Sequence, residues 1–459
     1  MREFLTTGRL DPSKRLVVER TKDFNEIYEV FDNPDASQQS ERCIQCGDPF
    51  CLNKCPLHNY IPQWLKSIAE KDLEFAFKLS NEPSPFPEVM GRVCPHDRLC
   101  EGDCTLNDGH GAITIGSIET YISEEGFKQG LKPDFPGVTR DKKVAIIGSG
   151  PAGLSAATYL LRSGFGVSMY ERADRAGGLL TYGIPNFKLD KKVVERRVKL
   201  LVEAGMDLHV NCEVGKDISF EEVADNHDAI FIGIGATSAK GAGISGESAS
   251  NVYMSMEYLT AIGQKNFGQN YPKEFDFKDL DVVVIGGGDT AMDCVRTAKR
   301  EGAKSVTCLY RRDAHNMPGS KKEYKNAMEE GVDFTFYASP KEIIIGDESK
   351  AVGVSMIKTI LGAKDKSGRQ RMEEVNGSEF QVKADVVIMA LGFDPAVPAF
   401  FAENGIETND WGGVIVDDNH QTSTSGIYAG GDCYRGADLV VTAAFDGREA
   451  ARSIIKSLG

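Results

Sequence analysis

Seven of the eleven cysteines lie in two short groups within the first quarter of the chain. The first group has the spacing Cys-x2-Cys-x4-Cys-x3-Cys-Pro, and the second reads Cys-Pro-x4-Cys-x3-Cys. In a reducing compartment, thiols grouped this closely indicate metal or redox chemistry rather than disulfide bonds. The candidate metal ligands are Cys43, Cys46, Cys51, Cys55, Cys94, Cys100 and Cys104.

Iron–sulfur clusters and zinc are the two candidates for this site, because four cysteines at short spacing also form closed zinc sites. Three features favour iron–sulfur. The Cys-Pro pairs are typical of bacterial two-cluster ferredoxins, in which the last cysteine of a run ligates the other cluster. Seven thiolates fall one short of two all-cysteine clusters, and a polar side chain can fill the gap. A nucleotide-binding segment follows, and a flavin there requires an outlet for single electrons. We expect two [4Fe–4S] clusters.

The eighth ligand has four local candidates. They are His58, His96, His110 and Glu119. The first two histidines fit capping or packing roles beside the cysteines. Glu119 lies where a helix is expected to return toward the clusters, although a solvated helix carboxylate is the competing interpretation.

A complete strand–helix–strand unit for a dinucleotide follows the cysteines. Val144–Ile147 predicts a buried strand, Leu154–Arg162 a helix, and Val167–Tyr170 a second strand. The turn between them matches G-x-G-x-x-G, which permits a tight turn, backbone approach to a pyrophosphate at a helix N-terminus, and close helix–strand packing. An acidic residue about twenty positions on is the expected acceptor for ribose hydroxyls. The candidate contacts are Gly148, Gly150, Pro151, Ala152, Gly153 and Glu171.

The stretch 177–188, GGLLTYGIPNFK, comes directly after this unit. Paired glycines after an acidic strand end are typical of backbone that passes close to a flavin. Lys188 could pair with the flavin ring or its pyrophosphate, and a surface lysine is the equal alternative.

A second nucleotide unit lies further along the chain. Val282–Ile285 predicts a strand, G-x-G-x-x-A follows, a helix runs to about Arg300, and Ser305–Tyr310 predicts the next strand. Where the first unit ends in glutamate, this one ends in two arginines, which accept a 2′-phosphate that a carboxylate would repel. The unit is therefore expected to bind NADP(H), with surface ion pairs as the other role for the arginines. The candidate contacts are Gly286, Gly288, Asp289, Thr290, Arg311 and Arg312.

These sites imply three structural units. Ile61–Leu79 has helical apolar spacing between the cysteine groups, so residues 1–140 predict an all-α domain around the metal. Two buried strands that end in glycine, Asp228–Ala236 and Asp385–Phe393, mark crossings between nucleotide domains. We therefore expect an FAD-binding domain at 141–240 and 387–459, with an NADPH-binding domain inserted at 241–386.

The composition is that of a globular protein in a reducing compartment. The 459 residues are 41% hydrophobic and 26% charged, and the net charge of −15 argues against nucleic-acid or anionic-membrane partners. Neither a secretory signal nor an apolar run of roughly 18 residues occurs, so we expect a cytoplasmic protein without a membrane partner. The remaining four cysteines form no Cys-x-x-Cys motif, so we do not expect a redox-active disulfide beside the flavin. Cys294 is expected to be packed in the core.

Several long motifs resemble the small (β) subunit of bacterial NADPH-dependent glutamate synthase. They include GRVCPHDRLCEGDCTLN at 91–107, KVAIIGSGPAG at 143–153, VVVIGGGDTAMDCVRTA at 282–298 and AGGDCYRGADLVVTAAFDG at 429–447. The resemblance implies two Rossmann-type nucleotide-binding domains, adrenodoxin- or glutathione-reductase-like, behind an all-α iron–sulfur domain. It also implies crosswise ligation. Cys43, Cys46, Cys51 and Cys104 would hold one cluster, and Cys55, Cys94, Cys100 and Glu119 the other.

The resemblance implies further FAD contacts. Asp432, at the end of a C-terminal strand, would bind the ribityl chain, although a strand-end aspartate can be only a helix cap. The helix N-terminus near Thr442 would face the pyrimidine end, where its dipole stabilises negative charge on reduced flavin. The remaining implied contacts are Gly178, Leu179, Val214, Gly392 and Gly431.

The function implied is electron input. NADPH would reduce FAD, and single electrons would pass through the clusters to the FMN of a large (alpha) subunit that makes glutamate from glutamine and 2-oxoglutarate. No eight-fold βα repeat is present for a barrel that could carry out that last step. The alternatives are an NADP-linked ferredoxin or sulfide oxidoreductase subunit of the same architecture, and a zinc-binding adaptor with a vestigial flavin fold.

Overall fold

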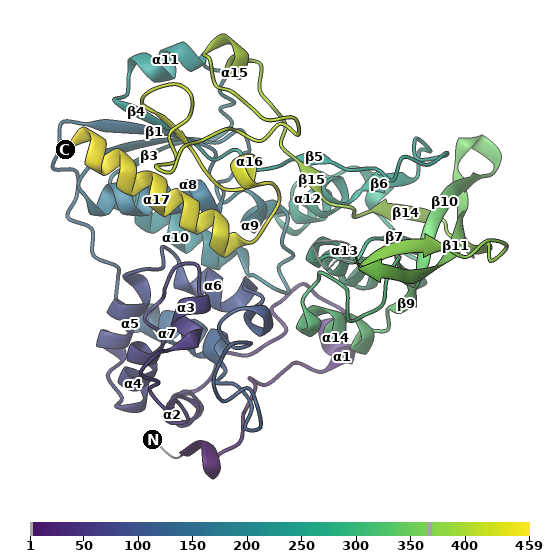
Figure 1. Ribbon diagram of the computed structural model, residues 1–459, viewed down its shortest axis with the longest axis horizontal. Helices are drawn as coiled ribbons and strands as arrows, with labels where there is room; N and C mark the ends of the chain where they lie inside the picture. The colour runs from purple at the N-terminus through teal and green to yellow at the C-terminus, as the bar shows by residue number, and fades with distance from the viewer. Residues whose placement is uncertain (1–2, 365–369) are drawn as a thin grey trace.

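The computed structural model describes residues 3–364 and 370–459. A helical part lies beside one α/β unit, and a second α/β unit is attached at the side (Figure 1). This arrangement confirms the predicted fold class of two Rossmann-type units preceded by an all-α part.

The helical part consists of short helices joined by the cysteine-bearing loops. They are α2 (Asn33–Glu41), α3 (Phe50–Lys54), α4 (Ile61–Ala69), α5 (Leu73–Asn81), α6 (Pro87–Val93) and α7 (Ile115–Lys128). The stretch Ile61–Leu79, which has helical apolar spacing in the sequence, is helical in two pieces, because the chain breaks between α4 and α5. Lys71 has a φ of +63°, and the Asp72 carboxylate caps α5 by accepting from Phe75 N at 3.0 Å.

The first α/β unit is a five-stranded parallel sheet in the order β16-β4-β1-β2-β3. Its strands are β1 (Lys143–Ile147), β2 (Gly166–Tyr170), β3 (Met206–His209), β4 (Ala229–Ile232) and β16 (Ile427–Ala429). The apolar runs seen in the sequence are buried here, as expected for a parallel sheet covered by helices. Its helices are α8 (Pro151–Arg162), α9 (Leu179–Tyr182), α10 (Lys191–Glu203), α11 (Phe220–Asp225), α15 (Phe400–Glu403), α16 (Asp432–Arg435) and α17 (Val440–Leu458).

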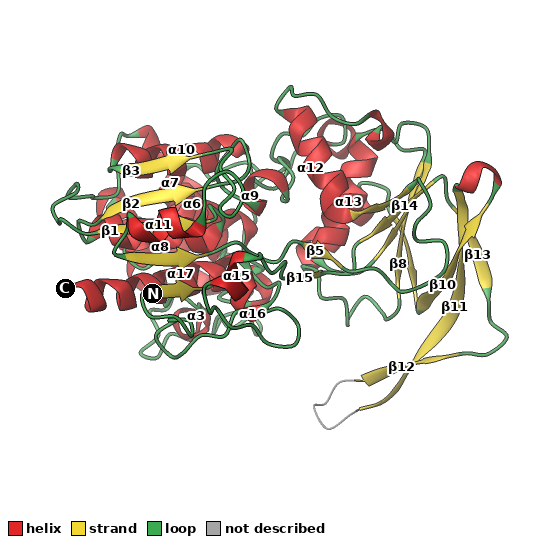
Figure 2. Cartoon of the chain, turned by 90° about the horizontal axis from the view of Figure 1, so that it is seen from above, coloured by secondary structure: helices red, strands yellow, loops and turns green. Residues whose placement is uncertain are grey.

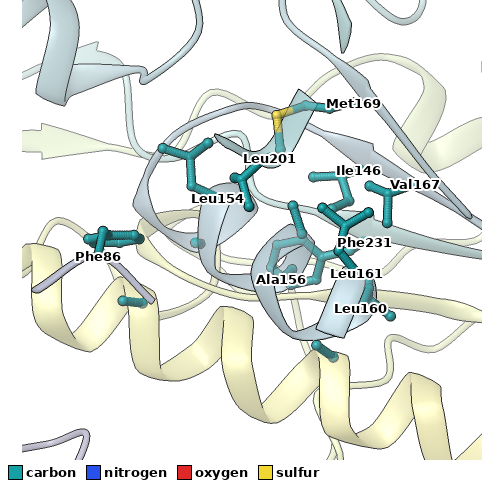
Figure 3. Packing of buried hydrophobic residues seen from close by; sticks show 14 of the residues in the cluster. Phe86, Ile146, Leu154, Ala156, Leu160, Leu161, Val167, Met169, Leu201 and Phe231 are labelled. Carbon is teal, nitrogen blue, oxygen red and sulfur yellow. The ribbon is translucent and has the colours of Figure 1, made fainter. Parts of the chain in front are cut away.

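The helical part and this unit share one hydrophobic core. Phe86, beside α6, belongs to one hydrophobic cluster with side chains of α8 and the sheet, including Leu154 and Ile146 (Figure 3). The same core includes Leu57, which lies just after the first cysteine group. The two parts are therefore expected to fold and move as one body.

The second α/β unit is a parallel sheet in the order β6-β14-β7-β8-β9. Its strands are β6 (Val252–Met254), β7 (Asp281–Ile285), β8 (Ser305–Tyr310), β9 (Asp333–Phe336) and β14 (Val386–Met389), and its helices are α12 (Ser255–Asn266), α13 (Asp289–Arg300) and α14 (Lys321–Glu329). An antiparallel arm projects away from both sheets (Figure 2) and is built from β10 (Ala338–Ile345), β11 (Ala351–Lys364), β12 (Gln370–Glu374) and β13 (Phe380–Lys383).

The boundary expected at residue 387 requires correction. It falls inside β14, which pairs with β6 and β7 over its length, so the strand belongs to the inserted unit. The chain crosses between the units at β5 (Ser238–Ala239) and β15 (Phe393–Asp394), which pair with each other antiparallel. In the sequence, a buried strand cannot be told from the connecting segment that follows it. The strand pairing in the structure shows where the strand ends.

The N-terminal segment runs along the second α/β unit before it enters the helical part. Arg20, at the end of α1 (Val17–Arg20), is 1% exposed and lies 2.8 Å from Glu329 and 3.1 Å from Glu330 of the α14 region. Lys14 Nζ lies 2.6 Å from Glu329 Oε2. The first thirty residues therefore connect two units and are not confined to the helical part.

Across the described ranges, no helix combines the length and apolar content needed to traverse a bilayer.

Candidate cofactor sites

The glycine-rich loop between β1 and α8 leaves open space where a pyrophosphate would approach. A Cβ on Gly150 would meet no atom within 4 Å. The glycines on either side are tightly packed: a Cβ on Gly153 would lie 2.0 Å from the Gly148 oxygen, and one on Gly148 would lie 2.5 Å from the Gly233 oxygen. Gly148 has a φ of +98°, which L side chains rarely adopt. This combination of turn, open approach and close packing fits a dinucleotide.

Two distant segments meet this loop. A Cβ on Gly178 would lie 2.9 Å from Gly150 Cα, so the paired glycines pass directly over the loop. A Cβ on Gly431 would lie 2.9 Å from the Ala152 side chain, at the first turn of α8, which begins at Pro151. Segments predicted to contact one cofactor are thus brought together around the N-terminus of α8.

The Glu171 carboxylate is held at the end of β2. It accepts hydrogen bonds from the Ser149 backbone N–H at 3.1 Å, the Ser149 hydroxyl and the Ala173 N–H at 2.8 Å. The side chain is buried. These bonds hold the carboxylate against the glycine-rich loop, where the ribose of a dinucleotide would bind.

Asp432 begins α16 close to the start of α17. Burial raises the pKa of its carboxyl to about 7, with the Asp438 charge adding to this and the Arg435 guanidinium opposing it. A buried carboxyl of this kind suits hydrogen bonding to hydroxyl groups of a ligand. The Thr442 hydroxyl accepts from Leu439 N at 3.1 Å and caps the first turn of α17.

The other four predicted FAD contacts lie at separate places in the structure. Lys188 Nζ lies 2.8 Å from Asp293 Oδ1 of the second unit, so its described partner is a carboxylate. Leu179 begins α9 and is partly exposed, and Val214 is buried in the first unit. A Cβ on Gly392 would meet nothing within 4 Å at the second crossing. Cofactor contacts for these four residues stay predictions.

The second glycine-rich loop repeats the geometry of the first. A Cβ on Gly286 would lie 2.2 Å from the Ala390 oxygen, whereas a Cβ on Gly288 would meet no atom within 4 Å. Asp289 and Thr290 form the first turn of α13, whose N-terminus is therefore open to an anion. The residues fit the pyrophosphate of a second dinucleotide.

Arg311 and Arg312 follow β8. Arg311 is exposed, and Arg312 is partly buried with one Nη donating to the Gln370 oxygen at 3.3 Å. Across residues 3–364 and 370–459, no carboxylate lies within ion-pair distance of either guanidinium, and the buried Arg312 Nε lacks a hydrogen-bond partner. The donors present suit a phosphate.

One set of thiols surrounds a cavity in the helical part. Cys43, Cys46, Cys51 and Cys104 line one small pocket. Burial raises the pKa of the Cys43 thiol to about 11 and that of Cys51 to about 12, and the neighbouring thiols add to both shifts. Four soft donors around one cavity fit an iron–sulfur cluster, whose core is wider than a single ion.

A second set lies deeper. Burial raises the pKa of the Cys94 and Cys100 thiols well above its ordinary value, and charges on Cys55 and Glu119 add to both shifts. Glu119, on α7, is 5% exposed, so a solvated carboxylate is ruled out. Burial raises its pKa to about 8, opposed by a hydrogen bond from Asn59 Nδ2 to Oε1 at 2.7 Å. These three thiols and this carboxylate influence one another electrostatically, and their role as a second donor set stays a prediction.

The local histidines have other environments. A Cβ on Gly116 would lie 2.3 Å from the His96 ring, so this ring packs against α7. His110 meets Phe4 edge-to-face at 4.9 Å, and His58 is exposed. Over the described parts of the chain, no three His, Cys, Asp or Glu side chains converge as closely as one bound ion requires.

The cysteines outside the two sets do not pair in the described structure. Cys294 and Cys308 are buried in the core of the second unit, as predicted for Cys294, and Cys433 is buried in the first. Cys212 is partly exposed.

Two contributions were not predicted from the sequence. Asn59 lies between α3 and α4, and no pattern links it to Glu119, sixty positions away. Phe187 stacks under Arg296 and Arg300 of α13, at 4.4 and 3.9 Å from its ring centroid. Both contacts join residues far apart in the chain, which local spacing cannot indicate.

The chain is similar to two described families and to several known proteins. The family of dihydropyrimidine dehydrogenase domain II, 4Fe-4S cluster, matches residues 20–131, and pyridine nucleotide-disulphide oxidoreductase matches residues 142–447. Glutamate synthase [NADPH] small chain of Halomonas elongata is 48% identical, covering 99% of this chain and 98% of that protein. Putative oxidoreductase AegA of Escherichia coli is 46% identical, covering 99% and 70%. Mycobacterium tuberculosis FprA in complex with NADPH shares the fold, with a TM-score of 0.60, 20% identity, and coverage of 70% and 85%.

Proposed function

This chain belongs to the family of bacterial glutamate synthase [NADPH] small chains, and we propose on that premise that it is the NADPH-oxidising, electron-input subunit of a glutamate synthase. The observation that carries the proposal is the presence in one chain of two open glycine-rich loops and two separate sets of soft ligands. An NADP-binding site, a flavin site and two one-electron sites are the parts such a subunit needs.

Each cofactor has a set of residues to hold it. The first loop and Glu171 would bind FAD, while the second loop with Arg311 and Arg312 would bind NADPH. When bound, NADPH supplies a hydride, FAD accepts its two electrons, and the clusters carry electrons one at a time. The chain's own residues bind and orient these groups, and no side chain is required as an acid or base.

The two sets of ligands differ in their distance from the flavin unit. Cys55 and Cys94 pack against the core that the helical part shares with that unit. Cys100 of the same set is buried in the helical core. Cys43, Cys51 and Cys104 pack at the edge of that core, and the chain beside Cys46 is exposed at Gly47. We therefore assign an inner set and an outer set, with the outer set facing an electron acceptor at the surface.

Glutamate formation is assigned to a large partner chain. The overall reaction converts glutamine, 2-oxoglutarate, NADPH and a proton to two glutamates and NADP⁺. This chain contributes the oxidation of NADPH, and the partner contributes the nitrogen transfer.

A second candidate is supported by the similarity to a putative oxidoreductase at nearly the same identity. In this case the same cofactor arrangement would serve another electron acceptor, such as a ferredoxin. Both candidates require NADPH oxidation by this chain and differ in the partner.

The test is glutamate formation from glutamine, 2-oxoglutarate and NADPH, with and without a large glutamate synthase chain. The proposal expects glutamate only when both chains are present, and NADPH oxidation with an artificial acceptor by this chain alone. Retained NADPH oxidation with no glutamate would favour the second candidate. Absence of flavin and iron from the purified protein would overturn both.

A further inference from the structure

Asn59 links a buried tryptophan to the carboxylate of the inner ligand set. Its Nδ2 donates to Glu119 Oε1 at 2.7 Å, and its Oδ1 accepts from Trp64 Nε1 at 3.2 Å. Trp64 is 0% exposed and Asn59 4%. Because Trp64 fixes which end of the amide faces Glu119, the amide nitrogen is the end presented to the carboxylate.

The backbone of Asn59 approaches the same set. Burial raises the pKa of the Cys55 thiol, and the backbone N–H groups of Asn59 and Leu57 oppose this effect. Asn59 therefore influences both the thiol and the carboxylate ligand, from the loop that joins α3 to α4. These helices and α7, which carries Glu119, lie together in the helical part (Figure 1).

The carboxylate that Asn59 contacts interacts electrostatically with the three thiols of the inner set. Beyond burial, which has the larger effect, the Glu119 charge raises the pKa of Cys55, Cys94 and Cys100. An aspartate or glutamate ligand has two oxygens and a rotatable end, so its geometry is less fixed than that of a cysteine. Hydrogen bonds to such ligands orient them and tune the metal group they hold.

We propose that Asn59, fixed by Trp64, is the positioning residue for Glu119, and that it sets the reduction potential of the inner cluster through that ligand. This inference rests on the proposed function, because it requires a cluster at the inner set. A hydrogen bond donated to an anionic ligand stabilises the more negative, reduced state. Loss of the bond is therefore expected to lower the potential of that cluster alone.

The test is a reduction titration of the holoprotein with a low-potential reductant, followed by low-temperature electron paramagnetic resonance and iron content. Asn59→Leu keeps the branched shape of the side chain and removes the amide. We expect its inner-cluster potential to fall by about 59 mV, which is a tenfold change in the one-electron equilibrium. The outer cluster serves as the internal reference and should not shift.

Three further variants separate positioning from general stability. Trp64→Phe removes the indole donor together with part of the buried ring and should give a smaller shift of the same sign. It provides a second test if the Asn59→Leu protein fails to fold. Ser123→Ala removes a buried 3.0 Å hydrogen bond to the Glu119 backbone oxygen and should shift neither cluster. Because Asn59 acts through Glu119, Glu119→Ala combined with Asn59→Leu should shift the potential no further than Glu119→Ala alone.

Unchanged potentials in folded Asn59→Leu or Trp64→Phe protein with full iron content would overturn the inference. Equal shifts of both clusters, or additive shifts in the double variant, would also overturn it. Failure of the cofactor assignment is distinguishable, because the wild-type protein would then show no pair of clusters to titrate, and failure of glutamate formation alone would leave both clusters and the expected shift in place.

Discussion

Lys188 Nζ lies 2.8 Å from Asp293 Oδ1, and this buried ion pair joins the FAD unit to helix α13 of the NADPH unit. Phe187, its neighbour, stacks under two arginines of the same helix. The Asp293 charge, with those of Glu323 and Asp289, outweighs the opposing effect of burial and raises the pKa of Lys188. The helix that begins at the second glycine-rich loop is therefore fixed relative to the flavin unit.

Lys188→Met should destabilise the protein by about 3–5 kcal/mol, because it leaves Asp293 buried without its partner. Chemical denaturation of the apoprotein would measure the free energy of unfolding. Lys192→Met, an exposed change four positions away, is the matched control and should cost less than about 0.5 kcal/mol. Equal effects of the two changes would contradict the assigned role of the ion pair.

Gly150→Ala should weaken FAD binding, whereas Gly153→Ala should lower the stability of the protein itself. A methyl group on Gly150 enters open space, so the apoprotein should keep its stability while FAD affinity falls at least tenfold. A methyl group on Gly153 would lie 2.0 Å from a carbonyl oxygen, so this change should lower the melting temperature even without FAD. Flavin fluorescence titration and thermal unfolding separate the two. Wild-type FAD affinity in the Gly150→Ala protein would contradict the assignment of Gly150 to the pyrophosphate-binding loop.

Arg311→Ala together with Arg312→Ala should reduce the preference for NADPH over NADH. Each hydrogen bond to a charged group is worth about 1.5–3 kcal/mol, so kcat/KM for NADPH should fall at least tenfold. The value for NADH should change little, because NADH lacks the 2′-phosphate. Lys341→Ala removes an exposed charge from the same unit and is the control. An unchanged NADPH/NADH ratio in the double variant would show that other residues read the phosphate.

The buried Asp432 predicts a pH dependence of apoprotein stability. Burial raises its folded-state pKa from 3.8 to about 7, so the folded state binds the proton more tightly than the unfolded state. This stabilisation is complete below about pH 4 and is lost as the pH rises through 7. Asp432→Asn should therefore show a smaller loss of stability between pH 4 and pH 8 than the wild-type protein. Parallel stability profiles for the two proteins would contradict the shift.

The nucleotide units were the most predictable part of the fold from sequence. Each combines a buried apolar strand, a glycine pattern and a helix within about thirty residues, so that local sequence contains the whole unit. The predicted strand Ser305–Tyr310 coincides with β8. The break between α4 and α5 was not indicated by the sequence, because the helical apolar spacing of Ile61–Leu79 continues across the cap at Asp72, where the chain turns.

The long-range part of the site could not be read from spacing. The path of the N-terminal segment to α14 depends on ion pairs of Arg20 with residues more than three hundred positions away. The partner of Lys188 depends equally on how the two units pack. Separation of the cysteines into an inner and an outer set follows from the three-dimensional arrangement of the helices, although the resemblance had implied the same two sets.

The central claim is that electrons from NADPH leave this chain through its clusters, and one comparison tests it most directly. Cys46→Ala, which removes a ligand of the outer set, should be assayed beside wild type in complex with a large chain. Cys212→Ala, outside both sets, is the matched control. The account predicts that the Cys46→Ala protein still reduces its flavin with NADPH but forms no glutamate, while the Cys212→Ala protein does both. Glutamate formation at the wild-type rate by Cys46→Ala protein that lacks the outer cluster would contradict it.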